Sequence, residues 1–279
     1  MSRFKGVLIT ALLGFRRTVF STRGIVFILM CTFFVSFQTE GLRELADKYN
    51  TRMEAVFLPY LHSDGLYQML FGILCIYFYS DAPFQSGSMF YSVMRIGKKK
   101  WVWANILKVY FLALHIMLFE AAISILINLG NIKIDNTWDA LWNTISVSWF
   151  NDGVLFSRNV IISFTPFQAT FRVVSMGVLV VGMIGLIQYC FSLIFGKRIA
   201  IAVNGIICIL PLLAVYTRYP YLYYISPISW VGIIEHSAGH RFHSPALIFM
   251  YMTALILDVV MIIILQKVTS RKDMNITEE

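Results

Sequence analysis

The chain has 279 residues, of which 58% are hydrophobic and 14% are charged, whereas an average soluble domain has roughly 45–50% and about 25%. This composition excludes an ordinary soluble protein, and no long stretch has the mixed composition of a separate soluble catalytic domain. The formal net charge of +8 comes from Lys and Arg scattered between apolar runs, which favours a membrane protein over a nucleic-acid-binding one.

Residues 1–22 predict an amphipathic helix in the inner membrane interface. Apolar residues recur at three- and four-residue spacing from Phe4 to Val19, while Arg3 and Arg17 fall on another face. Arg16 and Arg17 argue against a cleaved signal peptide. The alternative is a tilted cytoplasmic extension of the first span.

Six long apolar runs predict six transmembrane helices, because each crossing of a hydrocarbon core of about 30 Å needs ~20 mostly apolar residues. The first two runs are short, so their helices must include flanking residues, toward Leu42 in one case and back toward Leu58 in the other. We expect an all-α polytopic membrane protein with a single transmembrane domain over residues 1–279. The runs are 24–38, 66–79, 104–129, 173–195, 199–215 and 246–265.

The basic residues predict the orientation. With the N-terminus inside, fourteen Lys and Arg fall in the inner segments and eight in the longer outer segments. This asymmetry satisfies the positive-inside rule. We therefore expect a multi-pass protein of the plasma membrane with both termini cytoplasmic.

The inner loop 81–100 predicts a short surface helix. Asp81 can cap its start, and Pro83 is tolerated in a first helical turn. Its apolar side would dock a partner, or pack on the inner ends of the spans or on lipid headgroups. That side carries Phe84, Met89, Phe90, Val93 and Met94, and Arg95 ends the helix.

Two outer segments are rich in aromatic residues. In the loop 130–171, Trp138, Trp142 and Trp149 are expected to anchor the chain at the membrane interface rather than to stack on a substrate. In segment 217–245, Pro220 and Pro227 interrupt any continuous crossing. This predicts short re-entrant helices that dip into the outer leaflet before the last span.

The sequence contains no catalytic motif. The patterns GxxxxGK[ST], GxSxG and HExxH are all absent, so this chain is expected neither to hydrolyse ATP nor to be an enzyme. The four cysteines lie inside apolar runs without paired spacing, which favours buried free thiols.

A histidine cluster follows Glu235. On a helix His236 and His240 would share one face, and His243 would lie close enough to join them as a zinc ligand. Gly239 weakens such a helix and no known motif matches, so no metal site is assigned, with these three histidines as weak candidates.

Glu120 and Asp258 fall within the third and sixth spans. An ionised carboxylate is costly there, so both are candidates for a transport path. Both could instead be structural: neutral, hydrogen-bonded or facing a partner subunit.

The order of these parts resembles the permease subunits of type-2 ATP-binding-cassette exporters over essentially the whole chain. The similar stretches are 79–84 (YSDAPF), 94–98 (MRIGK) followed by Trp101, and 224–230 (YISPISW). Permeases of that family have an interfacial N-terminal helix, six spans, a coupling helix between spans two and three, and re-entrant outer helices before span six. The outer loop after the third span is longer here than is common in that family.

The resemblance implies a pair of ATPase subunits and a second permease chain, identical or homologous, as partners. ATP and Mg²⁺ would then bind the ATPase subunits, and this chain would carry no cofactor. It also implies that the inner loop contacts an ATPase subunit through Asp81, Phe84, Met89, Phe90, Met94 and Arg95.

We therefore expect a non-enzymatic permease subunit that exports an amphipathic or hydrophobic compound, such as a peptide, lipid or drug-like molecule. One alternative is a membrane-embedded metalloenzyme that uses Glu235, His236, His240 and His243. The other is an ion-coupled carrier that works through Glu120 and Asp258, which should show inverted repeats that the sequence lacks.

Overall fold

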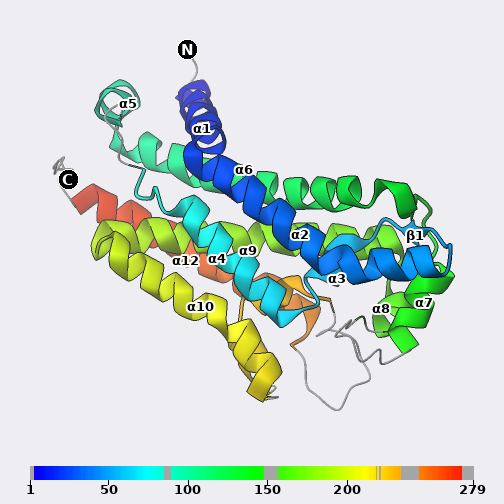
Figure 1. Cartoon of the computed structure of the whole chain (residues 1–279). Helices are drawn as coiled ribbons and strands as arrows, with labels where there is room; N and C mark the ends of the chain where they lie inside the picture. Colours follow the sequence, from blue (N-terminus) through cyan, green and yellow to red (C-terminus); the bar gives the residue numbers. More distant parts are fainter. Residues whose placement is uncertain are drawn as a thin grey trace.

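The computed structural model describes residues 3–84, 89–147, 156, 158–217, 219, 221–233 and 245–271. Long helices run side by side and form one bundle (Figure 1). The helices are α1 (Arg3–Val19), α2 (Thr22–Lys48), α3 (Phe57–Leu61), α4 (Gly65–Tyr79), α5 (Met89–Ile96), α6 (Lys98–Ile127), α7 (Ala140–Val147), α8 (Arg158–Ser163), α9 (Pro166–Ile194), α10 (Lys197–Thr217), α11 (Leu222–Ile225) and α12 (Leu247–Arg271), with 3₁₀ turns η1 (Leu129–Asn131) and η2 (Ile228–Val231).

Five of these helices, α2, α6, α9, α10 and α12, are long and apolar enough to cross a membrane. The expectation of an all-α polytopic membrane protein is confirmed at this level. The run 66–79 lies in α4, which has 15 residues and is therefore about 22 Å long, less than the ~30 Å of a hydrocarbon core.

The second run does not extend back toward Leu58 as one helix, which corrects the sequence-based expectation. The Asp64 side chain accepts a hydrogen bond from the backbone N–H of Leu66 at 3.0 Å and so caps α4. Leu58 belongs instead to the separate short helix α3. The first run does extend toward Leu42, because α2 continues to Lys48.

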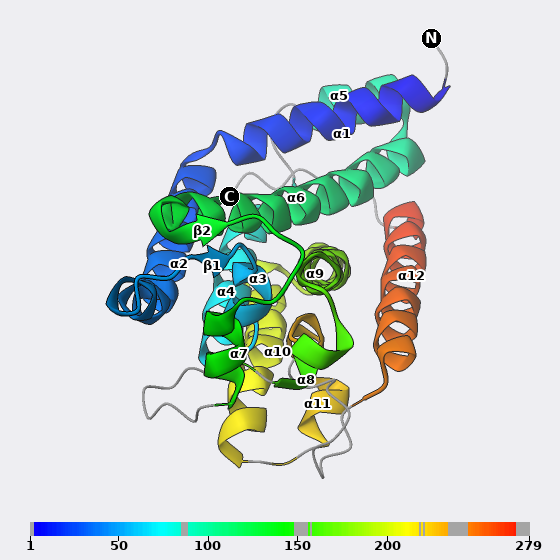
Figure 2. The same ribbon diagram turned by 90° about the vertical axis from the view of Figure 1, so that its right-hand side faces the viewer.

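A break also separates the first two helices. The side chain of Ser21 accepts a hydrogen bond from Gly24 N and caps α2, while α1 ends at Val19. From there α1 lies alongside α6 (Figure 2). Because of this break, α1 points in a different direction from α2. That α1 lies in the membrane interface stays a prediction.

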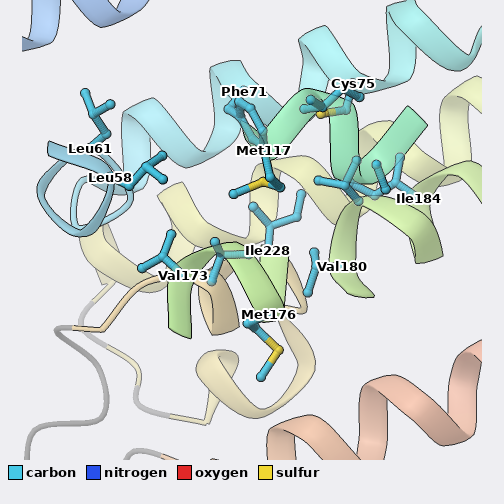
Figure 3. Packing of buried hydrophobic residues seen from close by; sticks show 14 of the residues in the cluster. Leu58, Leu61, Phe71, Cys75, Met117, Val173, Met176, Val180, Ile184 and Ile228 are labelled. Atoms are coloured by element: carbon cyan, nitrogen blue, oxygen red, sulfur yellow. The ribbon is translucent and has the colours of Figure 1, made fainter. Parts of the chain in front are cut away.

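Helix α9 lies at the centre of the bundle and contacts α4, α6, α10 and α12. Figure 3 shows apolar side chains of α9 packed together with Met117 of α6, Phe71 of α4 and Ile228 of η2. The α9 side chains in this view are Val173, Met176, Val180 and Ile184.

The end of the bundle opposite the two termini carries a small cap (Figure 1). Strands β1 (Met53–Glu54) and β2 (Ile132–Lys133) pair in parallel. The buried carboxylate of Glu54 accepts the backbone N–H of Asp135 at 2.9 and 3.0 Å. The cap therefore joins the segment after α2 to the segment after α6.

The tryptophan expectation is wrong for Trp142. Its side chain is fully buried in this cap, and its indole N–H donates to the carbonyl of Glu54 at 3.1 Å. Trp138 is partly buried and donates to the carbonyl of Phe164 at 2.7 Å. Both side chains therefore serve packing inside the protein, and Trp149 lies outside the described residues.

The approach of α9 to its neighbours depends on glycine. A Cβ on Gly185 would lie 2.7 Å from a methyl carbon of Val109 and 2.9 Å from the ring of Tyr79, whereas a Cβ on Gly205 of α10 would meet nothing within 4 Å. We expect Gly185→Val to lower the free energy of unfolding by about 1–3 kcal/mol, because overpacking forces the helices apart. Thermal unfolding in detergent micelles measures this.

Gly205→Val is the matched control, since it adds the same side chain to α10, another long apolar helix, at a position with free space. An equal loss of stability in the two variants would contradict close α6–α9 packing as the cause.

Candidate functional site

The side-chain carboxylate of Glu120, on α6, forms hydrogen bonds with two other side chains inside the bundle. The Tyr67 hydroxyl donates to its Oε1 at 2.5 Å, and Nε2 of His62 lies 3.1 Å from its Oε2. All three side chains are buried. The carboxylate thus connects α6 to the start of α4 and to the residue that follows α3.

The surroundings of His62 hold this group in place. Its carbonyl accepts a hydrogen bond from the Gln68 side chain at 2.6 Å, and its ring packs edge-on against Tyr67 and Phe71. Among the described residues, Nδ1 of His62 has no hydrogen-bond partner. With its proton on Nε2, the His62 ring donates a hydrogen bond to the Glu120 carboxylate.

Asp258, on α12, forms a separate polar contact. The Tyr110 hydroxyl of α6 donates to its Oδ2 at 2.7 Å, while the buried Oδ1 has no hydrogen-bond partner within the described parts of the chain. Tyr110 precedes Glu120 by ten residues, which is about 15 Å along a helix. The structure therefore places the two carboxylates predicted for a transport path in different groups rather than in one site.

A third buried contact lies between α9 and α10. The Asn204 side chain donates to the Gln188 side-chain oxygen at 2.9 Å. Interhelical hydrogen bonds of this kind stabilise membrane bundles by modest amounts.

At the end that carries the termini, an ion pair joins α2 to the loop after α4. Arg23 NH1 lies 2.7 Å from Asp81 Oδ1. Burial alone raises the pKa of Asp81, but the hydrogen bond and charge of Arg23, helped by Lys108 and Lys197, outweigh it and leave this pKa lowered.

Phe84 turns inward from the same loop. Its side chain is 8% exposed, the ammonium of Lys108 lies 3.9 Å from its ring centroid, and it packs against Tyr189. The stem of Lys108 also approaches α1, since a Cβ on Gly14 would lie 3.1 Å from its Cδ. One cluster thus connects α1, the loop, α6 and α9.

Asp81 does not cap a helix at Ala82 and Pro83, which corrects the sequence-based expectation, because residues 81–83 form a turn that ends at Phe84. The described part of the surface helix is α5, Met89–Ile96. Met94 and Arg95 of α5 are exposed, whereas Val93 and Ile96 pack toward the core. The side chains of Met89 and Phe90 lie outside the described part of the structure.

The histidine cluster also lies outside the described residues, because Glu235, His236, His240 and His243 all fall in the gap 234–244. Within the described ranges, no group of three His, Cys, Asp or Glu side chains is arranged to hold a metal ion.

Sequence reasoning missed His62, Tyr67 and Tyr110. His62 precedes the second apolar run and Tyr67 and Tyr110 lie within apolar runs, so no local pattern marks them. A buried carboxylate predicts only that some donor must exist, and which donor follows from helix packing.

We expect Glu120 and His62 to be energetically coupled. In a double-mutant cycle with Glu120→Gln and His62→Phe, the two losses of unfolding free energy should be non-additive by about 1–3 kcal/mol, because the first substitution leaves the second little to remove. Denaturant unfolding in micelles gives the four free energies. His115→Phe is the control, since His115 contacts Phe15 and Phe119 instead; its effect should add to that of Glu120→Gln.

The Arg23–Asp81 pair should respond to acid. Since folding lowers the pKa of Asp81, the ionised carboxylate stabilises the folded protein above the ordinary aspartate pKa of about 3.9, and this contribution is lost as the pH falls through the lowered value. The melting temperature of the wild type should exceed that of Asp81→Asn at pH 7, and the difference should shrink at pH 3. A difference that is constant with pH would contradict the ion pair.

Comparison of the chain with protein-family models, with curated proteins and with solved structures gave no match.

Proposed function

We propose that the chain is the membrane-spanning permease subunit of an ATP-driven exporter in the plasma membrane. The observation that carries this proposal is α5, a short helix at the same end of the bundle as both termini (Figure 1). Val93 and Ile96 hold it to the bundle while Met94 and Arg95 face outward. An apolar and cationic surface held in this way suits the docking of a cytoplasmic partner.

A six-span topology is part of the proposal. Helices α2, α4, α6, α9, α10 and α12 run in alternating directions (Figure 1), so six crossings would leave both ends of the chain on one side of the membrane. The short α4 would cross with local thinning of the bilayer or with α3 extending its reach. Lys98, Lys99, Lys100, Lys197 and Arg198 then lie inside, as the positive-inside rule requires.

The energy for transport would come from ATP hydrolysed by other subunits. Since the sequence has no phosphate-binding loop, ATP and Mg²⁺ belong to a pair of ATPase subunits, and this chain is not an enzyme. A second permease chain, identical or homologous, would complete the path for an amphipathic or hydrophobic substrate.

The contacts of the inner loop suggest how movement would be transmitted. A displacement of α5 acts on the turn at 81–84, which is bound to α2 through Arg23–Asp81 and to α6 through Lys108–Phe84. In this proposal Asp81 and Phe84 position the loop, and Met89, Phe90, Met94 and Arg95 form the contact surface. Rigid-body tilting of packed helices is the usual form of such a switch.

Affinity purification from native membranes in mild detergent tests the proposal. We expect a stoichiometric partner with a phosphate-binding loop, identified by mass spectrometry, and we expect the double variant Met94→Asp, Arg95→Glu to lose it. Ile134→Asp is the control, because Ile134 is exposed at the opposite end of the bundle. A chain that is purified without an ATPase, or a partner that both variants retain, would overturn the proposal.

A second candidate function is an ion-coupled carrier. The observation that favours it is the buried Asp258, whose Oδ1 meets no hydrogen-bond partner among the residues that the structure describes. A carrier would accumulate substrate in ATP-free vesicles under an imposed proton gradient and would lose this activity in Asp258→Asn. An exporter would need ATP and its partner under the same conditions.

A further inference from the structure

Helix α1 has two apolar sides, and they have different surroundings. One side packs on the bundle, where Ala11 is 1% exposed and the ring of Phe15 lies edge-on against Phe111 and His115 of α6. Ala11 and Phe15 belong to the apolar spacing that predicts an interfacial helix. Part of the side that was expected to face lipid therefore packs on α6 instead.

The opposite side of α1 is exposed. At 3.6 residues per turn its positions fall within an arc of about 100°, so they form one continuous surface. The four apolar side chains on it, Ile9, Leu12, Leu13 and Phe20, are 42%, 47%, 64% and 77% exposed. We call this surface the α1 stripe, and its residues are Lys5, Ile9, Leu12, Leu13, Arg16 and Phe20.

The stripe is cationic as well as apolar. Helix α1 contains four basic residues and no acidic one. Among the described residues, neither Lys5 nor Arg16 takes part in an ion pair. Arg16 also borders a hollow of about 400 Å³, which is lined by Leu13, Arg16, Arg17 and Phe20. A ligand of this surface should therefore combine a negative charge with an apolar part.

The direction of α1 indicates where such a ligand would lie. Figure 1 shows α2 lengthwise and α1 foreshortened, whereas Figure 2 shows α1 lengthwise and α2 nearly end-on. Helix α1 therefore lies across the direction of α2, near the end of the bundle that carries both termini. Contacts with α5 and α6 hold it there. If α2 crosses the bilayer, α1 lies along the bilayer surface, as cationic amphipathic helices do.

We propose that the α1 stripe binds an anionic phospholipid in the leaflet at the end of the bundle that carries the termini. The lipid phosphate lies beside Arg16, and the acyl chains lie along Leu12, Leu13 and Phe20. A free anion would leave these exposed apolar side chains in water, and an acidic soluble protein could not reach a surface that the bilayer covers. The site depends on the membrane location of the bundle and is independent of the proposed export function.

Native mass spectrometry of the full chain in detergent tests the site with two lipids. Dioleoyl phosphatidylglycerol and dioleoyl phosphatidylcholine have the same acyl chains and a phosphate each, but only the first has a net negative charge. We expect phosphatidylglycerol to bind about fivefold more tightly, because each basic residue near an anionic lipid contributes on that order. Inorganic phosphate at the same concentration should not displace it.

Two substitutions separate the charge from the apolar surface. Arg16→Gln should weaken phosphatidylglycerol binding about fivefold and leave phosphatidylcholine binding unchanged. Leu13→Ser should weaken the binding of both lipids about tenfold, because it removes apolar contact area without changing the charge. The matched controls are Arg52→Gln and Ile134→Ser, which alter exposed residues at the opposite end of the bundle and should leave both affinities unchanged.

Four outcomes would overturn the proposal. Equal affinity for the two lipids would show that negative charge is not recognised, and displacement by inorganic phosphate would indicate a simple anion site. Unchanged phosphatidylglycerol binding in folded Arg16→Gln would place the lipid elsewhere on the protein. A Leu13→Ser chain that keeps its lipid but no longer forms dimers would assign the stripe to a second copy of the chain. None of these results depends on an ATPase partner, so they leave the exporter proposal unaffected.

Discussion

The close packing of α9 against its neighbours is the constraint on which the rest of the structure depends. Inside a bilayer the hydrophobic effect does not drive helices together, so association rests on short-range packing and on interhelical hydrogen bonds. Gly185 admits the side chains of Val109 and Tyr79 at distances that no larger residue allows. Because α9 also contacts α10 and α12, the way in which α6 packs on α9 affects where these other helices lie.

The buried polar groups join these packed helices to one another at different positions along the bundle. Glu120 joins α6 to the α3–α4 segment, Asp258 joins α12 to α6, and the Asn204–Gln188 contact joins α10 to α9. Each pair connects two helices, and each would leave a polar atom unsatisfied in a dry interior if the helices moved apart. These contacts therefore specify which helix lies beside which, while apolar packing supplies most of the contact area.

The sequence predicts the apolar helices well because a long apolar run is a local property. Prediction from the sequence fails where a side chain has two possible partners. Asp81 has the pattern of a helix cap, yet its carboxylate binds Arg23, which lies 58 positions earlier, and the residues that follow Asp81 form a turn. Trp142 is of the residue type typical of an interfacial anchor, yet it fills the core of the cap at β1 and β2, where the carbonyl of Glu54 accepts its indole N–H.

The residues of the candidate site are likewise predictable from the sequence only in part. The cost of a carboxylate in a span marks Glu120 and Asp258 from sequence alone. Their partners His62, Tyr67 and Tyr110 carry no local signal, since a histidine or tyrosine near an apolar run has many ordinary roles.

The sequence separation of these contacts has a consequence for biogenesis. His62 and Tyr67 emerge from the ribosome before Glu120, their common partner, and a stretch of 58 residues separates His62 from it. At about 5–20 residues per second this delay is roughly 3–12 s. Glu54 waits longer still for the backbone of Asp135, 81 positions later. The segment that carries His62 and Tyr67 is thus made before the carboxylate that satisfies these side chains, and their polar atoms need other hydrogen-bond partners until α6 has been synthesised.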